Sequence, residues 1–242
     1  MSILKDRIAI VTGASSGIGA ACARAFAAEG AKLILAARRV DRLTALVSEI
    51  EKGGGVAVAC ATDCSKEADV EALFQLADEK FGRVDLLLNS AGIADHTPTD
   101  MITLARFREV MDANLTSTFL CCRAAFIRMK QQKRGRIINI GSISAKTPRP
   151  HNIAYASSKF GMEGMTRALA LDGRDHGITV SILHPGATAT ELMPGMGNRA
   201  AKDVMQASEI AAIATLIACL PDETNLLEAL AFPIGQAYLG RG

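Results

Sequence analysis

Residues 12–19 read TGASSGIG and join an apolar run, residues 8–11, to an alanine-rich helical pattern. Gly13 permits a tight turn, Gly17 lets the backbone approach a pyrophosphate, and Gly19 lets the helix pack close to the strand. The free amide groups at a helix N-terminus attract phosphate. The sequence therefore predicts a dinucleotide-binding strand–loop–helix unit, although an ordinary small-residue turn is the alternative. The residues expected to hold the phosphates are Gly13, Ser15, Ser16, Gly17, Ile18 and Gly19.

Apolar runs alternate with helical patterns along the whole chain. The runs show no in–out alternation, which is typical of strands covered on both faces of a parallel sheet. A repeated β-α series implies right-handed crossovers and helices on both faces. We therefore expect one Rossmann-type α/β domain over residues 1–242, a doubly wound parallel sheet of about seven strands. Strands are expected at residues 7–12, 32–37, 56–60, 84–91, 136–142, 179–185 and 227–232, and helices at residues 17–29, 40–51, 66–81, 103–131, 152–176 and 208–220.

Composition excludes several classes of protein. The 242 residues are 49% hydrophobic and 4% aromatic, and the net charge is only +2. Proteins that bind nucleic acid or an acidic membrane surface usually carry a basic patch or stacking aromatics, so we expect neither partner. The glycine-rich loop lacks the Gly-Lys-Ser/Thr ending of a P-loop, which disfavours nucleotide hydrolysis. The longest apolar helical run, residues 210–220, is too short to span a bilayer.

The cysteines indicate a reducing compartment. No pair has the spacing of a zinc ribbon or finger, and no histidine pair accompanies them, so we expect no metal site. Buried free thiols are the better interpretation, and they are typical of a cytoplasmic protein. The six cysteines are Cys22, Cys60, Cys64, Cys121, Cys122 and Cys219.

The end of the second predicted strand bears on the choice of cofactor. Sheets of this type bind ligands at the carboxyl ends of their strands. NAD-binding sheets place an acid at this point to hold the ribose 2′-hydroxyl, but here Ala36 and Ala37 are followed by two arginines. Guanidinium groups suit a 2′-phosphate, so Arg38 and Arg39 predict NADP(H). The alternative is that both arginines only form a solvated entry to the next helix.

Tyr155 and Lys159 are four residues apart on a predicted helix, which places them on one face. A tyrosine with a pKa near ~10 is a poor base at neutral pH, and a neighbouring ammonium lowers that pKa. The two residues therefore form a sensible proton-transfer pair. The spacing alone is common, because half-buried tyrosines often stand beside surface lysines. Ser142 ends the fifth predicted strand thirteen positions before Tyr155, and a serine at this place favours the catalytic interpretation of the pair.

Over about residues 12–190 these motifs occur in order, and the chain resembles the short-chain dehydrogenase/reductase family in its compact one-domain branch. The resemblance implies that Ser142 hydrogen-bonds the substrate oxygen and that Tyr155 exchanges a proton with it as hydride moves. Lys159 would hold the nicotinamide ribose and lower the pKa of Tyr155. Asn114, inside a long predicted helix, would bind a water that passes protons to Lys159. The implied catalytic tetrad is Asn114, Ser142, Tyr155 and Lys159.

The resemblance also implies which residues surround the rest of the cofactor. Asp63, beside Cys64, would contact the adenine. Ser16 stands where many NADP-binding members carry a basic residue, so Arg38 would bear most of the 2′-phosphate recognition. The residues expected around the adenine ribose are Asn89, Ala91 and Gly92, and those expected around the nicotinamide carboxamide are Pro185, Gly186, Thr188 and Thr190.

Together these expectations describe an NADP(H)-dependent oxidoreductase that moves hydride between the nicotinamide and a small-molecule carbonyl or secondary alcohol. Two alternatives stay open. One is a 3-oxoacyl-thioester (acyl carrier protein) reductase of fatty acid synthesis, and the other is a catalytically silent cofactor-binding sensor. The intact tetrad counts against the sensor, since a pure binder does not need all four residues.

The region after the sixth predicted strand is expected to cover the substrate. Residues 187–207 would form a mobile lid, or equally a helical satellite that packs its methionines on the core. His151 and Asn152, just before Tyr155, could face the substrate. We expect a homodimer or homotetramer, but the last strand lacks the family's Asp-Gly-Gly segment, which puts the tetramer in doubt. The flexible residues of the lid segment are Met193, Pro194, Gly195, Met196, Gly197 and Met205.

Overall fold

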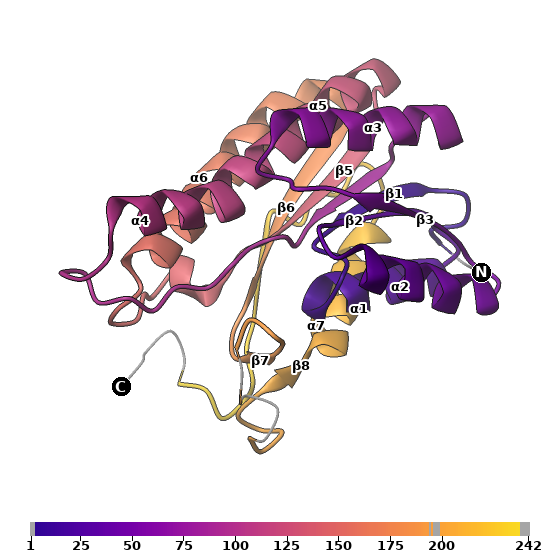
Figure 1. Cartoon of the computed structure of the whole chain (residues 1–242). Coiled ribbons are helices and arrows are strands. Elements are labelled where there is room, and N and C mark those ends of the chain that lie inside the picture. Colours follow the sequence, from indigo (N-terminus) through magenta and orange to yellow (C-terminus); the bar gives the residue numbers. More distant parts are fainter. Residues whose placement is uncertain (1–2, 194, 196–198, 238–242) are drawn as a thin grey trace.

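The computed structural model describes residues 3–193, 195 and 199–237, and its centre is a seven-stranded parallel sheet (Figure 1). The strand order is β3-β2-β1-β4-β5-β6-β9, so the chain builds outward from β1 in one direction and from β4 in the other. Doubly wound sheets bind their ligands at this reversal. The predicted Rossmann-type sheet is confirmed. The strands are β1 Ile8–Thr12, β2 Lys32–Ala37, β3 Val56–Ala61, β4 Leu86–Asn89, β5 Gly135–Ile140, β6 Ile178–Pro185 and β9 Glu228–Ala231.

Helices cover both faces of the sheet, with α1, α2 and α7 on one face and α3, α5 and α6 on the other (Figure 1). Successive side chains of a strand point to opposite faces, so β1 sends Ala9 and Val11 into one core and Ile10 into the other. Within the described residues no helix combines the length and the apolar character needed to cross a membrane. The helices are α1 Gly17–Ala28, α2 Val40–Lys52, α3 Glu67–Phe81, α4 Leu104–Met111, α5 Ser117–Gln132, α6 Ile153–Gly173 and α7 Ala207–Ala218.

Two strands end earlier than the sequence predicts, at the edge where ligands would bind. β4 stops at Asn89 and β5 at Ile140, each two residues before its predicted end. Beyond β5, the Ser142 hydroxyl accepts the N–H of Ser144 at 3.1 Å and so begins a 3-10 turn, Ile143–Ala145. The backbone therefore leaves the sheet before Ser142, which places this residue on a loop rather than on a strand.

The predicted single helix at residues 103–131 is wrong at its centre. A π-helical turn, Asp112–Thr116, separates α4 from α5 and contains the fully buried Asn114. Asparagine is a poor helix former, and π turns frequently occur at functional sites. Leu115 of this turn packs against α6 at Gly161, where a Cβ atom would lie 2.8 Å from a Leu115 methyl carbon.

A second, two-stranded parallel sheet was not predicted. It pairs β7, Thr188–Ala189, with β8, Met205–Gln206, and so closes the base of the segment between them. Met205 is buried against the core that α1 and α7 share. The expected lid is thus attached to the body of the protein at both of its ends.

Candidate active site

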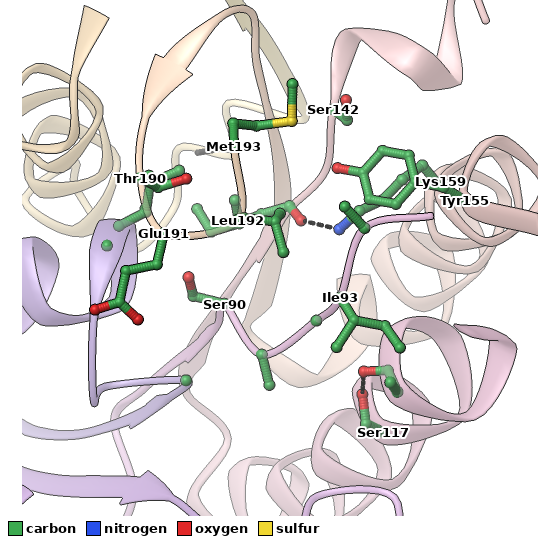
Figure 2. A pocket seen from close by; sticks show the side chains of 18 of the residues that line it. Ser90, Ile93, Ser117, Ser142, Tyr155, Lys159, Thr190, Glu191, Leu192 and Met193 are labelled. Carbon is green, nitrogen blue, oxygen red and sulfur yellow. Dashed lines mark hydrogen bonds between the residues drawn. The ribbon is translucent and has the colours of Figure 1, made fainter. Parts of the chain in front are cut away.

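A cavity of about 940 Å³ lies at the carboxyl ends of β1, β2, β4, β5 and β6. Figure 2 shows Tyr155 and Lys159 on one wall and Glu191 on the opposite one. A volume of this order is at the upper end for ligand sites, as a dinucleotide with a substrate would require. The predicted site residues that line it are Gly13, Ser15, Ser16, Gly17, Ile18, Arg38, Arg39, Asp63, Cys64, Ala91, Gly92, Ser142, Tyr155, Lys159, Pro185, Gly186, Thr188 and Thr190. The predicted site residues outside the lining are Gly19, Asn89 and Asn114.

The glycine loop after β1 packs against the loop after β4. Gly13 has a φ of 65°, and a Cβ atom there would lie 2.7 Å from the main chain of Ser90 and Ala91, so only glycine fits. Thr12 Oγ1 accepts the N–H of Ser90 at 3.1 Å and that of Ala91 at 3.3 Å. Gly19 lies outside the lining because its role is packing, since a Cβ atom there would overlap the Gly13 carbonyl oxygen. The two loops form one wall at the N-terminus of α1, where backbone amides can bind phosphate.

The two arginines after β2 have different surroundings. Arg38 is exposed, lines the cavity, and has no side-chain hydrogen bond or ion pair among the described residues. Arg39 donates to the Ser16 hydroxyl at 2.6 Å and to Glu191 at 2.7 Å. Hydrogen bonds from Arg39 and from Arg42 lower the pKa of Glu191 to about 2. Arg38 is therefore the available cation, while Arg39 already binds a hydroxyl and a carboxylate.

The loop after β3 contributes Asp63 and Cys64 to the lining. Asp63 Oδ1 accepts the hydroxyl of Ser65 at 2.7 Å and its N–H at 3.1 Å. These hydrogen bonds, with the charge of Arg38, lower the pKa of Asp63. Asp63 is thus an ionised acceptor on the cavity wall, which suits an amino group such as that of adenine. The Cys64 side chain is buried.

Asn89 and Asn114 are buried behind the cavity and connect its walls. Asn89 Nδ2 donates to Asn139 Oδ1 at 2.9 Å and ties β4 to β5. Asn114 Oδ1 accepts the N–H of Ile93 at 2.7 Å, and its Nδ2 donates to the Ile93 carbonyl at 3.1 Å and to the Ser158 hydroxyl at 3.0 Å. Both amide hydrogens of Asn114 are engaged by protein groups, so it holds the loop after β4 against α6. The water relay expected at Asn114 stays a prediction.

Tyr155 and Lys159 enter the cavity from α6, one turn apart (Figure 2). Lys159 Nζ lies 5.6 Å from the Tyr155 ring centroid and donates to the Ile140 carbonyl at 2.9 Å. Burial lowers the pKa of Lys159 to about 8. Burial also raises the pKa of Tyr155, against the opposing influence of a hydrogen bond with Ser142 and the charge of Arg149. The expected lowering of the Tyr155 pKa by Lys159 is therefore not seen, and the Tyr155 hydroxyl is protonated at neutral pH beside Ser142.

The end of the cavity around Ser142 and Tyr155 contains polar groups that the sequence singled out only in part. Asn152 is 4% exposed and lines the cavity, as expected, and its Oδ1 has no hydrogen-bond partner among the described residues. His151 has a φ of 57° and lies outside the lining. Ser144 and Arg149 line the cavity without having been predicted. The one sequence signal for Ser144 was its position two residues after Ser142, and Arg149 had no such signal.

His184 was also missed. It is fully buried on β6, outside the cavity lining, and its Nδ1 lies 2.9 Å from the carbonyl oxygen of Ser142. Its position directly before Pro185 and Gly186 was the only available signal. A residue behind the lining cannot be identified from strand-end position alone, because the contact joins β6 to a loop that is distant in sequence.

Two described methionines of the lid segment have different surroundings, one at the cavity and one in the core. Leu192 and Met193 line the cavity (Figure 2), whereas Met205 is part of the core. Gly195 is described but does not line the cavity. The remaining lid residues of the prediction, Pro194, Met196 and Gly197, lie outside the described residues.

Comparison with known proteins agrees with this geometry. A family model described as short chain dehydrogenase matches residues 7–201. The 3beta-hydroxysteroid dehydrogenase 1 of Eggerthella lenta is 42% identical over 192 residues, which cover 78% of this chain and 73% of that protein. A 3-oxoacyl-[acyl-carrier-protein] reductase of Synechocystis sp. is 38% identical over 193 residues, which cover 79% of this chain and 78% of that protein.

Solved structures of the same family share the fold. A metagenomic short-chain oxidoreductase, crystallised in complex with NADP, superposes with a TM-score of 0.85. It is 33% identical, and the match covers 96% of this chain and 98% of that one. The ordered motifs, the seven-stranded sheet and the family match lead to one conclusion: the chain belongs to the short-chain dehydrogenase family.

Proposed function

We propose that the chain is an NADP(H)-dependent oxidoreductase that moves hydride between the nicotinamide and a carbonyl or secondary alcohol. One observation carries this proposal: a single cavity joins the Tyr155–Lys159 pair and Ser142 to the glycine loop and Arg38. The residues fit the cofactor, because a Cβ atom on Gly13 would fill the loop and Arg38, unpaired among the described residues, lines the end where a 2′-phosphate would lie. The NADP complex of the metagenomic relative supports the same cofactor.

The side chains around the reacting atoms suit carbonyl reduction. NADPH, when bound, supplies the hydride. Ser142 hydrogen-bonds the substrate oxygen, and Tyr155 gives its proton to that oxygen as negative charge develops there. Lys159 holds the nicotinamide ribose with its ammonium group. In the oxidative direction Tyr155 must first lose its proton, which its raised pKa opposes at neutral pH.

A 3-oxoacyl thioester bound to acyl carrier protein is the second candidate substrate. Arg108 and Arg149 both line the cavity, and neither has an ion pair among the described residues. Free cations at the substrate end suit a substrate attached to an acidic carrier. The 38% identity to the Synechocystis reductase supports this candidate, and the 42% identity to the hydroxysteroid dehydrogenase supports a ketone that is not carrier-bound.

An activity panel tests the proposal and separates the substrates. Oxidation of NADPH would be followed with small ketones, diketones, quinones, a 3-ketosteroid and a 3-oxoacyl thioester, and NADPH binding would be measured by fluorescence. The proposal expects turnover with at least one carbonyl. Tight NADPH binding with no turnover in either direction would instead support the silent sensor.

We also propose that the chain forms a homodimer or homotetramer in a reducing cytoplasm. Large apolar side chains are exposed on α5 and α6, among them Phe119 at 46%, Phe160 at 48% and Leu171 at 63%. Of the small residues on α6, Gly164 and Ala168 are exposed and would let a second helix approach. The six cysteines are free, which agrees with a reducing environment.

A further inference from the structure

A charged cluster lies next to Ser142 but outside the cavity lining. We call it the His184 network, and its members come from three elements and one loop. Its centre is His184 on β6, which is fully buried. The other members are Glu163 and Arg167 on α6, Glu228 on β9, and Lys146 just after the 3-10 turn that Ser142 begins. The mechanism proposed above uses none of these side chains.

His184 contacts the main chain of Ser142 on both sides of its Cα. Nδ1 lies 2.9 Å from the Ser142 carbonyl oxygen and 3.2 Å from the Ser142 nitrogen. A proton on Nδ1 makes the ring a donor to the carbonyl, and a proton on Nε2 makes Nδ1 an acceptor for the N–H. Gly141 permits this approach, because a Cβ atom there would lie 2.6 Å from Nδ1. In either tautomer the imidazole is bonded to the backbone that carries the Ser142 hydroxyl.

Two carboxylates lie near the opposite edge of the ring, and Nε2 has no hydrogen-bond partner among the described residues. His184 Nε2 lies 3.7 Å from Glu163 and 3.9 Å from Glu228. Lys146 Nζ lies 2.6 Å from an oxygen of each carboxylate, and Arg167 pairs with both at 2.6 and 3.1 Å. The two negative charges are therefore balanced by two cations around a neutral imidazole. Glu163, His184 and Glu228 have ligand atoms close enough together to hold a metal ion, but the ammonium group of Lys146 already lies between the two carboxylates.

The network joins the Ser142 loop to the helix that carries the proton donor. Tyr155, Lys159 and Glu163 follow one another at four-residue spacing, so they share one face of α6. His184 holds the start of the loop at Ser142, and Lys146 connects its end to Glu163. Any loosening of this connection would move the Ser142 hydroxyl relative to that of Tyr155.

We propose that His184, buried beside the ion-paired Glu163 and Glu228, is a positioning residue that sets the place of the Ser142 hydroxyl beside Tyr155. It touches neither substrate nor cofactor and acts through the main chain of Ser142. This inference rests on the proposed function, since it requires that Ser142 binds the substrate oxygen. The structural reason is the buried bond between the imidazole and the backbone of Ser142.

A matched pair of substitutions isolates that bond. Leucine and asparagine have similar shapes, and both remove the ring, but only asparagine keeps a polar atom where Nδ1 stands. We expect His184→Leu to lower kcat by ~10- to 100-fold, because a misplacement of about 1 Å at a reacting group costs on this order. KM for NADPH should not change, since the cofactor residues are untouched. His184→Asn should recover kcat to within about threefold, because one buried hydrogen bond is kept.

The results separate this proposal from a purely structural role and from the proposed function. Wild-type kcat in His184→Leu, or equal losses in both variants, would overturn the positioning role. Thermal melting is measured alongside, because a structural role lowers the melting temperature without this difference in kcat. Ser142→Ala reports on the proposed function, which fails if this variant keeps full turnover. If Ser142→Ala loses turnover but His184→Leu keeps it, only the positioning role fails.

A second variant covers the case in which His184→Leu does not fold. Glu163→Gln keeps the side-chain shape and removes one carboxylate from the network. We expect it to lower kcat severalfold with an unchanged KM for NADPH. Glu49→Gln is the control, because it breaks an exposed Glu49–Arg24 pair of 2.7 Å that is remote from the cavity lining. Equal kcat in the two glutamine variants would overturn the proposal.

Discussion

Replacing Arg38 with alanine should remove most of the preference for NADPH over NADH. Arg38 is exposed, lines the cavity and forms no ion pair within the part of the chain that the structure describes. A charge-assisted hydrogen bond to the 2′-phosphate is worth ~1.5–3 kcal/mol, which corresponds to about 10- to 150-fold in affinity. We expect kcat/KM for NADPH to fall by about this factor, while kcat/KM for NADH changes little.

Arg39 gives the comparison that makes this test sharp. Its guanidinium already binds Ser16 and Glu191, so much of its charge is offset before any phosphate arrives. Because binding a phosphate would compete with these contacts, Arg39→Ala should lower kcat/KM for NADPH by less than Arg38→Ala does. Arg42→Ala is the control, because Arg42 pairs with the same Glu191 but lies outside the cavity lining.

The assay is steady-state kcat/KM for both cofactors in the wild type and in these three variants. Equal values for NADPH and NADH in the wild type would refute the interpretation of the strand end. So would an unchanged ratio in Arg38→Ala, or a larger loss in Arg39→Ala than in Arg38→Ala.

Three further predictions concern catalysis, stability and assembly. Tyr155→Phe should keep the fold and the cofactor affinity and lose ~100- to 10,000-fold in kcat; a near-normal kcat would show that Tyr155 is not the proton donor. Lys159→Met should weaken NADPH binding, yet at pH 7 it should stabilise the cofactor-free chain by up to about 3 kcal/mol, because burial depresses the Lys159 pKa to about 8. Between that pKa and the pKa of an unfolded lysine, the unfolded state binds more protons than the folded state, so the stability of the wild type rises with pH. The stability advantage of Lys159→Met should therefore vanish near pH ~10. Denaturant unfolding at pH 7 and at pH ~10 tests this, and an advantage of the same size at both pH values would contradict it. Light scattering at micromolar concentration should give a dimer or tetramer and Phe160→Glu should shift it toward monomer, whereas a monomeric wild type would rule out the assembly.

The fold was predictable because its determinants are local. Unbroken apolar runs such as residues 8–11 indicate strands covered on both faces, and the pattern repeats with helices between. The glycine loop was identified by spacing, and the structure shows the steric reason at Gly13. The pairing of Tyr155 with Lys159 followed from helical geometry alone. Each of these inferences needed only residues within a few positions of one another.

Other expectations failed or stayed incomplete where a distant partner decides the local structure. The helix over residues 103–131 is interrupted because Leu115 packs into α6 at Gly161 and Asn114 bonds to the loop after β4. Gly161 is needed for this contact within the chain. Nothing in the helical pattern around Asn114 indicates that its side chain hydrogen-bonds to another element.

The sequence by itself determined the doubly wound parallel sheet and the side chains that stand at or just beyond the carboxyl ends of its strands. Only the tertiary structure decided what those side chains contact. His184 meets Ser142 across 42 positions of sequence, and Arg39 meets Glu191 across 152. The physical reason is that periodicity reports which face of an element is buried, whereas contacts between elements depend on strand order and on the close approach of whole segments. The exposed Arg38 on the cavity wall, the ion-paired Arg39 and the buried imidazole behind Ser142 all follow from that packing.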